Sequence, residues 1–334
     1  KAQVSKQLTM GIAGLLKMNK VKKVDGEAVF TGEKAIRVKK ADGAEEAMTA
    51  DAIIISTGSV NSTPPIPGLK ENPNCIDSTG ALSLEALPKS MVVIGGGVIG
   101  LELACAFAGY GTEVTVVELM PELMPKEQKE AVRVVLKALK QQGIRLLTGA
   151  KMLRVEKTPA GLKAVYEQDG KEGAVEAEQV LMAAGRKPNF SGIDAAALGL
   201  AMNGKFIAVD SHQRTNLPGV YAIGDVVGGY QLAHAAYAEG EAALADMLGR
   251  DEPYGTVPVP VCTYTIPCFA SVGLTTEAAK EAGYDPCLGS FDYSANGMAL
   301  AEGASGSVYV VMDKATKTTL GVTIVGENAS EMIA

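Results

Sequence analysis

The stretch MVVIGGGVIGLELACAF, residues 91–107, decides the fold of this chain. Its first four residues are apolar and typical of a buried strand, three glycines form a turn, and the rest favours a helix. Strand, glycine turn and helix in this order open a βαβ unit, in which helices join parallel strands. We therefore expect an α/β protein with a Rossmann-like sheet.

The glycines of this stretch predict a phosphate site. Gly95, Gly97 and Gly100 have the spacing G-x-G-x-x-G. The first glycine makes the tight turn, the second lets the backbone approach a pyrophosphate, and the third lets helix and strand pack closely. The pyrophosphate then lies at the positive end of the helix dipole. The loop predicted to bind it consists of Gly95, Gly96, Gly97, Val98, Ile99 and Gly100.

Glu118 strengthens the prediction of a dinucleotide. It ends a second predicted strand, residues 112–118, where a carboxylate can accept hydrogen bonds from an adenosine ribose. The same charge repels a 2′-phosphate, and the following residues 119–125, LMPELMP, contain no arginine to bind one. The pattern favours NAD(H) over NADP(H). The alternative is a glycine-rich turn followed by a solvated acid at the end of a strand.

Composition restricts the classes of function. The chain has 334 residues, enough for two or three domains, and 38 glycines with no tryptophan suit an α/β enzyme. A net charge of −7 argues against binding to nucleic acid or to an anionic membrane surface. No apolar run approaches the roughly 18 residues that span a membrane.

The cysteines and histidines predict neither disulfides nor a metal site. Five cysteines, irregularly spaced, form no disulfide framework, and two histidines complete no zinc cluster. A reducing compartment is expected: the cytoplasm, or the mitochondrial matrix if the protein is eukaryotic. Cys262 and Cys268 are too far apart in sequence for a usual redox pair, and Cys105 is expected in the core.

Three segments precede the C-terminal region. Residues 1–87 contain an initial helix, a hairpin and a buried strand that ends in a proline-rich turn. Residues 88–209 alternate strands and helices, including an amphipathic helix over 129–143. Residues 210–250 repeat the theme of a short strand that runs into Gly-Asp and a helix.

The remaining residues, 251–334, differ in composition. They are rich in β-branched residues and prolines, which predicts an antiparallel domain. The chain begins with Lys1 and ends in NASEMIA, a cap followed by the first turn of a helix. We expect both ends to be cut.

Several single residues allow two interpretations. Glu102 either complements the helix dipole in the first turn or lies near a nicotinamide. Asp225, in YAIGDVVGG, either hydrogen-bonds a cofactor hydroxyl or caps a turn. His234 begins a predicted helix and His212 lies in a predicted loop, and for both a packing role is favoured over catalysis.

The motifs together resemble the pyridine nucleotide–disulfide oxidoreductases, and among these the lipoamide dehydrogenases. The strings that carry the resemblance are IIISTGS…PPIPG, VVIGGGVIGLELA, AAGRKPN, GVYAIGDV, LAHAAYAEG, CTYTIPCFASVGLTTEAA and GVTIVGENASEMI. They occur in the family's order over nearly the whole chain. One departure is PCF at 267–269, where the family commonly has an acidic residue after the proline.

The resemblance implies two nested Rossmann-like domains, for FAD and NAD, and the start of an α+β dimerisation domain. The FAD domain would comprise residues 1–87 and 210–250, the NAD domain 88–209 and the interface domain 251–334. The family's FAD fingerprint and redox-active C-x-x-x-x-C would precede Lys1, and its His–Glu base would follow Ala334. The chain alone would then be incomplete and inactive.

The resemblance also assigns site residues. Glu102 would lie beside the contact between nicotinamide and flavin. NAD would be held by the glycine loop and Glu118, with Met152 and Gly185 closing around it. The residues implied for FAD are Ala28, Thr57, Gly58, Asp225, Gln231, Leu232, Ala233 and His234.

The implied reaction passes electrons from a dithiol through a disulfide and FAD to NAD⁺. The implied partners are a lipoyl-bearing protein or a small disulfide, and a second copy of the chain in a homodimer. Two alternatives remain: another flavoprotein disulfide reductase, similar to mercuric reductase or transhydrogenase, or a nucleotide-binding module without a redox centre.

Overall fold

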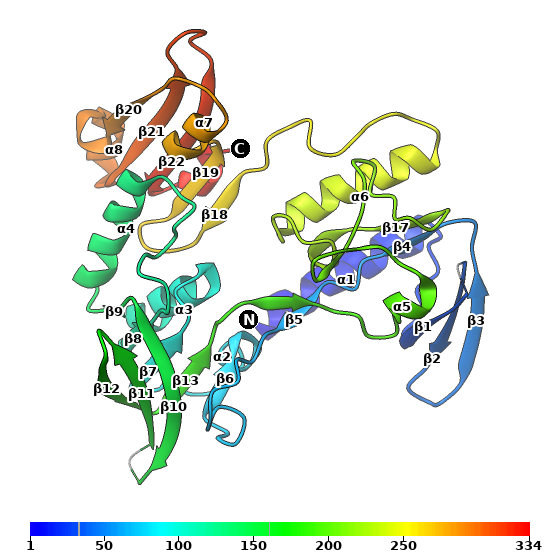
Figure 1. Ribbon diagram of the computed structural model, residues 1–334, viewed down its shortest axis with the longest axis horizontal. Coiled ribbons are helices and arrows are strands. Elements are labelled where there is room, and N and C mark those ends of the chain that lie inside the picture. The colour runs from blue at the N-terminus through cyan, green and yellow to red at the C-terminus, as the bar shows by residue number, and fades with distance from the viewer. Residues whose placement is uncertain (33, 160) are drawn as a thin grey trace. The chain divides into compact units, whose positions relative to one another are not determined.

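The computed structural model describes residues 1–32, 34–159 and 161–334. The chain divides into two compact units, each built from two stretches (Figure 1). The first unit comprises Lys1–Ser59 and Pro188–Tyr254, and the second Val60–Lys187 and Gly255–Ala334. The chain passes between them through β5 (Ser59–Asn61) and β14 (Arg186–Pro188), which pair with each other.

A five-stranded parallel sheet forms the centre of the second unit. Its strands follow the order β6-β13-β7-β8-β9, and every pairing is parallel. The predicted strand of the opening stretch is β7, whose last four residues are at most 5% exposed. The strands are β6 (Cys75–Asp77), β13 (Gln179–Met182), β7 (Ser90–Ile94), β8 (Glu113–Val117) and β9 (Arg145–Leu147).

Two helices connect the parallel strands, as predicted. Helix α3 (Val98–Gly109) follows the glycine turn, and α4 (Lys129–Gln141) is the expected amphipathic helix. The apolar faces of both helices pack into one hydrophobic cluster with the sheet. A short helix, α2 (Ser78–Ala81), follows β6. A parallel sheet whose strands are joined by helices confirms the predicted α/β class.

Two antiparallel sheets complete the second unit. A three-stranded sheet, β10-β11-β12, precedes β13 and bulges after Met152. The C-terminal residues form a five-stranded sheet in the order β18-β19-β22-β21-β20, and this confirms the predicted antiparallel region. The strands are β10 (Ala150–Thr158), β11 (Gly161–Gln168), β12 (Lys171–Ala177), β18 (Val261–Thr263), β19 (Phe269–Gly273), β20 (Pro286–Asp292), β21 (Gly306–Asp313) and β22 (Thr319–Gly326).

Short helices accompany the C-terminal sheet. They are α7 (Thr276–Glu281), η2 (Tyr293–Ala295), α8 (Gly297–Glu302) and α9 (Ala329–Met332). The last of these confirms the helical turn predicted for NASEMIA.

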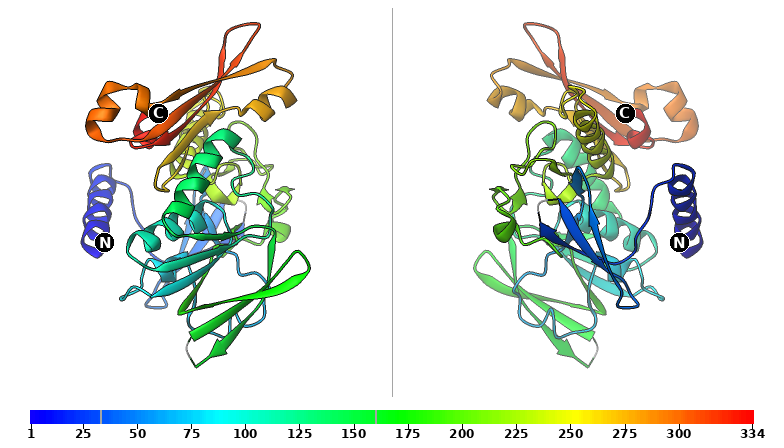
Figure 2. Two further views of the ribbon diagram at one scale, coloured as in Figure 1. Left: turned by 90° about the vertical axis from the view of Figure 1, so that its left-hand side faces the viewer. Right: turned by 90° about the vertical axis from the view of Figure 1, so that its right-hand side faces the viewer.

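The C-terminal sheet packs on the α4 side of the parallel sheet (Figure 2). Phe269 and Val325 belong to the same hydrophobic cluster as Leu139 of α4. Gln128, only 1% exposed, accepts hydrogen bonds from the Thr276 amide at 2.9 Å and the Thr276 hydroxyl at 3.2 Å. Nearby, the Ser271 hydroxyl donates to the Glu127 carboxylate at 2.9 Å. The two sheets therefore share one core, and partly buried polar contacts hold their junction.

The first unit contains the predicted initial helix, hairpin and buried strand. Its largest sheet is β1-β2-β3, and a parallel pair joins β4 and β17. The elements are α1 (Ala2–Met18), β1 (Glu27–Gly32), β2 (Ala35–Lys39), β3 (Glu45–Thr49), β4 (Ile53–Ile55), α5 (Ala195–Leu198), β15 (Met202–Asn203), β16 (Phe206–Ile207), β17 (Val220–Ala222), η1 (Gly224–Val226) and α6 (Ala233–Met247).

The buried Gln128 side chain gives a test of the sheet junction. Gln128→Ala leaves the Thr276 amide without its acceptor, so the free energy of unfolding should fall by about 1–3 kcal/mol. Urea denaturation followed by circular dichroism measures the change. Gln141→Ala, an exposed glutamine at the end of α4, the helix that Gln128 precedes, is the matched control and should change the midpoint little. An equal loss in both variants would contradict the assigned role.

Candidate functional site

The glycine loop is built from two positions that only glycine can occupy. Gly95 has φ +108°, and a Cβ added to it would lie 2.5 Å from the Ala183 carbonyl oxygen. A Cβ on Gly100 would lie 2.0 Å from the Gly95 carbonyl oxygen. The first glycine therefore makes the turn, and the third lets α3 start against β7.

Gly97 has a different environment. It precedes α3 as the N-cap, without a side-chain cap, and a Cβ added there would meet nothing within 4 Å. Val98 is 41% exposed, and Ile99 follows in the first turn. The first amides of a helix lack partners within the helix, so this open N-terminus suits a pyrophosphate. The loop thus fits the phosphate part of a dinucleotide.

Glu118 lies beside this loop. One carboxylate oxygen accepts the Gly96 amide at 2.6 Å, and the other accepts the Met120 amide at 2.7 Å. The charge therefore lies at the carboxyl end of β8, next to the helix N-terminus, where the sequence predicts a ribose. A carboxylate in this place is an acceptor for ribose hydroxyls and disfavours a 2′-phosphate.

The two residues expected to close around NAD differ in accessibility. Gly185 has φ +105°, a Cβ added to it would face open space, and its carbonyl oxygen accepts the Ser62 amide at 3.0 Å. Met152 is only 7% exposed and packs in the core with Val92 and Val117. A role for either residue in binding NAD stays a prediction.

Glu102 is not a first-turn acid, because the first turn of α3 contains none. The interpretation as a complement to the dipole is therefore wrong. Its half-buried carboxylate instead accepts the Tyr264 amide at 2.9 Å, from the loop between β18 and β19. Burial raises the pKa of Glu102, and this single backbone hydrogen bond opposes the shift.

Asp225 belongs to a second cluster, in the first unit. It lies in η1, whose N-cap is Ile223 with no side-chain cap, so Asp225 does not cap this turn. The Ser59 hydroxyl donates to the Asp225 carboxylate. The Gly224 amide, one residue earlier, donates to Glu239 at 2.6 Å. The turn that carries Asp225 is thus held by Ser59 of β5 and by Glu239 of α6.

Glu239 is a buried acid beside Asp225 that the sequence interpretation missed. It is 4% exposed, and burial together with the neighbouring Asp225 charge raises its pKa. A signal was present: Ala235, Glu239 and Ala243 are four residues apart in α6, and all three are buried. An acid on the buried stripe of a helix needs a partner, which here is the Gly224 amide.

Asn189 is the other missed residue. The Thr57 hydroxyl donates to its carbonyl oxygen at 2.6 Å, and its side-chain amide donates back to the Thr57 carbonyl at 3.2 Å. Its own backbone amide donates to the Gly58 carbonyl at 2.9 Å. The segment Thr57–Gly58, predicted to contact FAD, is therefore held in place by Asn189, which lies 132 positions after Thr57.

The start of α6 fits a phosphate-bearing cofactor. Gln231 has φ +54°, and its buried side-chain nitrogen has no hydrogen-bond partner in the described part of the chain. Leu232 is the N-cap, without a side-chain cap, and Ala233 and His234 are exposed at the helix start. An unpaired buried amide beside an open helix N-terminus indicates a missing acceptor.

The remaining residues singled out in the sequence are Ala28, His212 and the cysteines. Ala28 is exposed on β1, and its carbonyl oxygen lies so close to Gly192 that a Cβ there would be 1.8 Å away. His212 lies in a loop, as expected, and contacts Asp251 at 2.8 Å.

The cysteines are unsuited to nucleophilic chemistry. Cys105 is buried, and burial raises the pKa of the Cys105, Cys262 and Cys268 thiols, which opposes formation of the thiolate. The residues described contain no metal-binding group of three or more ligands.

The fold and these two clusters fit an oxidoreductase that binds two nucleotides. The family model for pyridine nucleotide-disulphide oxidoreductases matches residues 2–240, and that for the dimerisation domain of the same family matches 259–334. The chain belongs to the pyridine nucleotide-disulphide oxidoreductase family. FAD and NAD(H) are the family's cofactors, so the protein is a flavin-dependent, NAD-linked oxidoreductase.

Relatives in several bacteria agree with this assignment. The chain is 39% identical to a dihydrolipoyl dehydrogenase of Geobacillus stearothermophilus, covering 100% of this chain and 71% of that one. It is 40% identical to a dihydrolipoyl dehydrogenase of Thermus scotoductus, covering 99% and 71%.

Solved structures show the same fold. LpdA from Mycobacterium tuberculosis matches with a TM-score of 0.89 and 26% identity over 99% of this chain and 73% of its own. The HOCl-induced flavoprotein disulfide reductase RclA from Escherichia coli matches with a TM-score of 0.84 and 27% identity, over 93% and 70%. Among the described residues, no helix is long and apolar enough to cross a membrane.

Two glycine variants separate binding from folding. Gly97→Ala adds a Cβ in open space, so the free energy of unfolding should change little. NADH affinity should fall at least about tenfold, or roughly 1.4 kcal/mol, because the methyl group blocks the pyrophosphate. Gly100→Ala clashes with the Gly95 carbonyl and should destabilise the fold by about 1–3 kcal/mol.

Fluorescence titration with NADH and urea denaturation measure the two effects. Gly109→Ala, an exposed position at the end of α3 with no atom near the added Cβ, is the control. Unchanged NADH affinity in Gly97→Ala would exclude this helix end as the phosphate site.

The buried acid on α6 predicts a pH dependence. Because the pKa of Glu239 is raised above its ordinary value of 4.5, the fold favours the protonated form. Its contribution to stability is greatest below that value and declines as the pH rises through the raised pKa. Glu239→Gln should lack this decline, whereas Glu239→Ala should lose about 1–3 kcal/mol because Gly224 loses its acceptor.

Urea denaturation from about pH 4 to about pH 8 tests the sign of this effect. Glu241→Gln, an exposed acid on the same helix, is the matched control. A wild-type stability that rises with pH relative to Glu239→Gln would contradict the assignment.

Proposed function

We propose that this protein is a dihydrolipoyl dehydrogenase. The reaction converts a protein-bound dihydrolipoyl dithiol to its disulfide and reduces NAD⁺ to NADH with release of one proton. The relatives in G. stearothermophilus and T. scotoductus, both called dihydrolipoyl dehydrogenases, support this choice. We further propose a lipoyl-bearing protein as partner, a homodimer as the working form, and the cytoplasm as compartment.

The observation that carries the NAD-linked half is the carboxylate of Glu118 against the glycine loop. It accepts two backbone amides and so keeps a fixed place at the end of β8. The segment that follows, residues 119–125, brings no arginine or lysine to this end of the sheet. The charge balance supports NAD(H) as the nucleotide.

We propose these roles in NAD binding. The amides of the N-cap Gly97 and of Val98 and Ile99 at the start of α3 bind the pyrophosphate, while Gly95, Gly96 and Gly100 shape the loop. Glu118 orients the ribose, with Met152 and Gly185 around the nucleotide. Glu102, held by the Tyr264 amide, faces the nicotinamide.

We propose a parallel set of roles for FAD. Asp225, held through Ser59 and Glu239, accepts hydrogen bonds from the cofactor's hydroxyl groups. The open helix start at Leu232, Ala233 and His234, with the Gln231 amide, provides donors. Thr57, Gly58 and Ala28 complete this site. When both cofactors are bound, they supply the hydride transfer, and the protein supplies position and charge.

We propose that the four segments predicted from the sequence correspond to the domains of the protein. Residues 1–87 and 210–250 are assigned to FAD, 88–209 to NAD, and 251–334 to dimerisation. The dimerisation model, which matches 259–334, supports the last of these.

A second candidate is another flavoprotein disulfide reductase. The TM-score of 0.84 to RclA supports it. Cys268 also supports it, because the chain departs there from the acidic residue common in lipoamide dehydrogenases. Substrate assays separate the two.

The assay uses the protein purified from its native source. Dihydrolipoamide with NAD⁺ should yield NADH, and dihydrolipoamide alone should change the flavin spectrum. Glutathione disulfide with NADPH is the comparison. Turnover of the second pair without the first would overturn the proposal, and absence of any bound flavin would favour a nucleotide-binding module.

Replacing the Glu118 charge tests nucleotide choice. Glu118→Gln keeps an acceptor for the Gly96 amide but removes the repulsion of a 2′-phosphate. The preference for NADH over NADPH should fall at least about tenfold, or roughly 1.4 kcal/mol. Titrations with both nucleotides measure it. Glu113→Gln, at the exposed opposite end of β8, should keep the wild-type preference. If Glu118→Gln keeps it too, this carboxylate does not select the nucleotide.

A further inference from the structure

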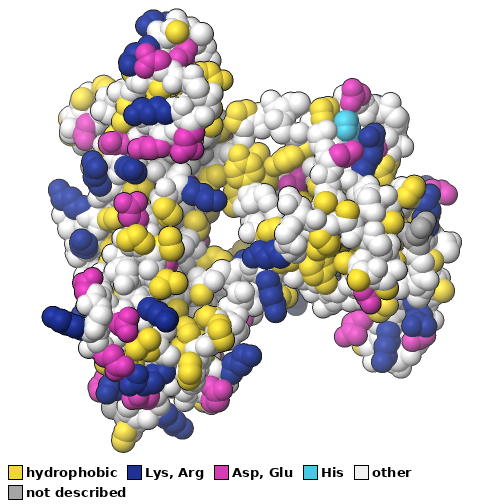
Figure 3. Space-filling view, in the orientation of Figure 1, with side chains coloured by type: hydrophobic (Ala, Val, Ile, Leu, Met, Phe, Trp, Pro, Cys, Tyr) yellow, Lys and Arg dark blue, Asp and Glu magenta, His cyan; other side chains and the backbone are white. Residues whose placement is uncertain are grey.

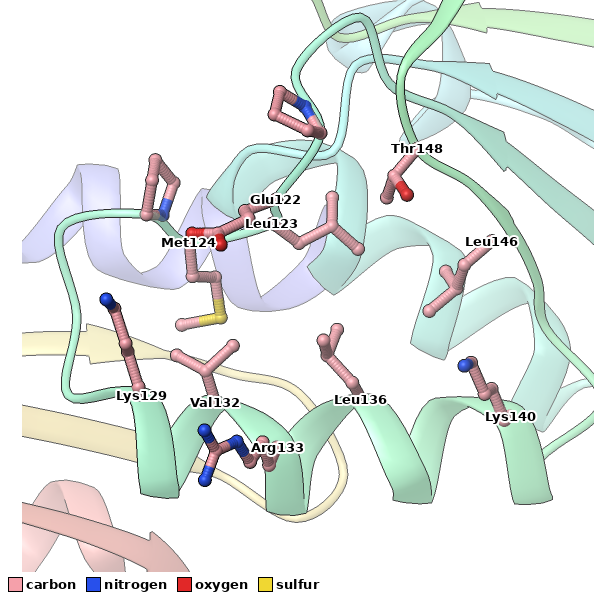
Figure 4. Close-up of a pocket in the computed structure, with 12 residues that line it drawn as sticks. Glu122, Leu123, Met124, Lys129, Val132, Arg133, Leu136, Lys140, Leu146 and Thr148 are labelled. Atoms are coloured by element: carbon pink, nitrogen blue, oxygen red, sulfur yellow. The ribbon is translucent and has the colours of Figure 1, made fainter. Parts of the chain in front are cut away.

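A groove runs along α4, between this helix and residues 121–125 (Figure 4). We call it the α4 groove. Leu123, Met124, Val132, Leu136 and Leu146 form its apolar floor. Figure 4 shows Val132 and Leu136 pointing from the helix toward Leu123 and Met124. Neither of the nucleotide sites described above includes this groove.

The rim of the α4 groove is basic. Lys129, Arg133 and Lys140 line it from α4, and Glu122 is the one acidic residue in the lining described. Lys129 lies 3.6 Å from Glu277. Within the described ranges, no carboxylate forms an ion pair with Arg133 or Lys140. Figure 3 shows Lys and Arg side chains beside hydrophobic ones over the surface where α4 lies.

Charge and shape together select a class of ligand. Lys129 and Lys140 are eleven residues apart, which is about 16 Å along a helix. Figure 4 shows them toward opposite ends of the groove, with the apolar floor between them. An apolar floor with a few cations at its edge suits an amphipathic anion with an extended body. Straight-chain carboxylates have this chemistry, because they combine one charged head with an extended apolar chain.

The groove shares a wall with the glycine loop. Leu123 is so close to Gly96 that a Cβ on that glycine would lie 2.0 Å from its side chain. The next residue, Met124, has φ +50°, which is costly for a residue with a side chain. Both residues also form the groove floor. A ligand that moves them would therefore act directly on the backbone predicted to bind NAD(H).

We propose that the α4 groove binds a straight-chain carboxylate and that its occupancy changes the affinity for NAD(H). The carboxylate pairs with Arg133 or Lys140, and the chain covers Val132 and Leu136. The site goes beyond the proposed function and rests only on the NAD-binding part of it. Linkage requires the effect to be reciprocal, so NADH changes carboxylate affinity by the same factor.

Calorimetry with octanoate as the probe tests binding by the full chain, with octanol as the neutral counterpart. Octanoate should bind at least about tenfold more tightly than octanol, which is roughly 1.4 kcal/mol. The double variant Arg133→Gln and Lys140→Gln should lose most of this difference. Lys137→Gln, an exposed lysine on α4 outside the lining, should not. Equal affinity for both probes, or an equal loss in Lys137→Gln, would overturn the site.

Coupling is measured by NADH titration with and without saturating octanoate. A shift in the NADH dissociation constant, matched by the reciprocal shift for octanoate, supports the proposal, and no shift overturns the coupling. Gly97→Ala should bind octanoate normally while NADH binding is weakened. If octanoate binding is lost with it, the probe occupies the pyrophosphate site. These measurements need no lipoamide activity, so they stand apart from a failure of the proposed reaction.

Discussion

The close approach of Gly100 to the Gly95 carbonyl is the constraint on which the second unit depends. With no Cβ between them, α3 can begin directly against the end of β7. Leu101, Ala104 and Cys105 then enter the core, and the helix N-terminus is left open at Gly97. One steric requirement thus aligns the hydrophobic packing and creates the anion site at the same place.

Local pattern predicts the parts of this structure in which neighbours in sequence are neighbours in space. The strand of the opening stretch, the glycine turn and helix α4 all lie where periodicity places them. The antiparallel C-terminal sheet also follows from composition. The sequence did not predict how β10, β11 and β12 pair, because alternation of apolar and polar residues identifies a strand but not the strand it pairs with.

Contacts between distant residues escaped prediction for a physical reason. Glu102 and Tyr264 are 162 residues apart, and the donor is a backbone amide that every residue except proline carries. In the pair Thr57 and Asn189 the Thr57 hydroxyl donates to a backbone carbonyl, which every residue carries. In the pair Gly224 and Glu239 the donor is again a backbone amide. Of these contacts, only that of Glu239 could have been suspected from the sequence, because its charge lies on an otherwise apolar face of the helix. Side-chain chemistry can be inferred from sequence, whereas backbone partners need the fold.

The Tyr264 contact joins the C-terminal region to helix α3. The loop between β18 and β19 donates the Tyr264 amide to Glu102 on α3, and accepts the Gln142 side chain, just after α4, at Ile266. Partly buried polar contacts of Glu127 and Gln128 hold the same junction. Helix α3 therefore packs on the parallel sheet and is also hydrogen-bonded, through Glu102, to the region that matches the dimerisation domain. A displacement of that region on dimer formation would reach Glu102 through a single hydrogen bond, and with it the end of α3 proposed to face the nicotinamide.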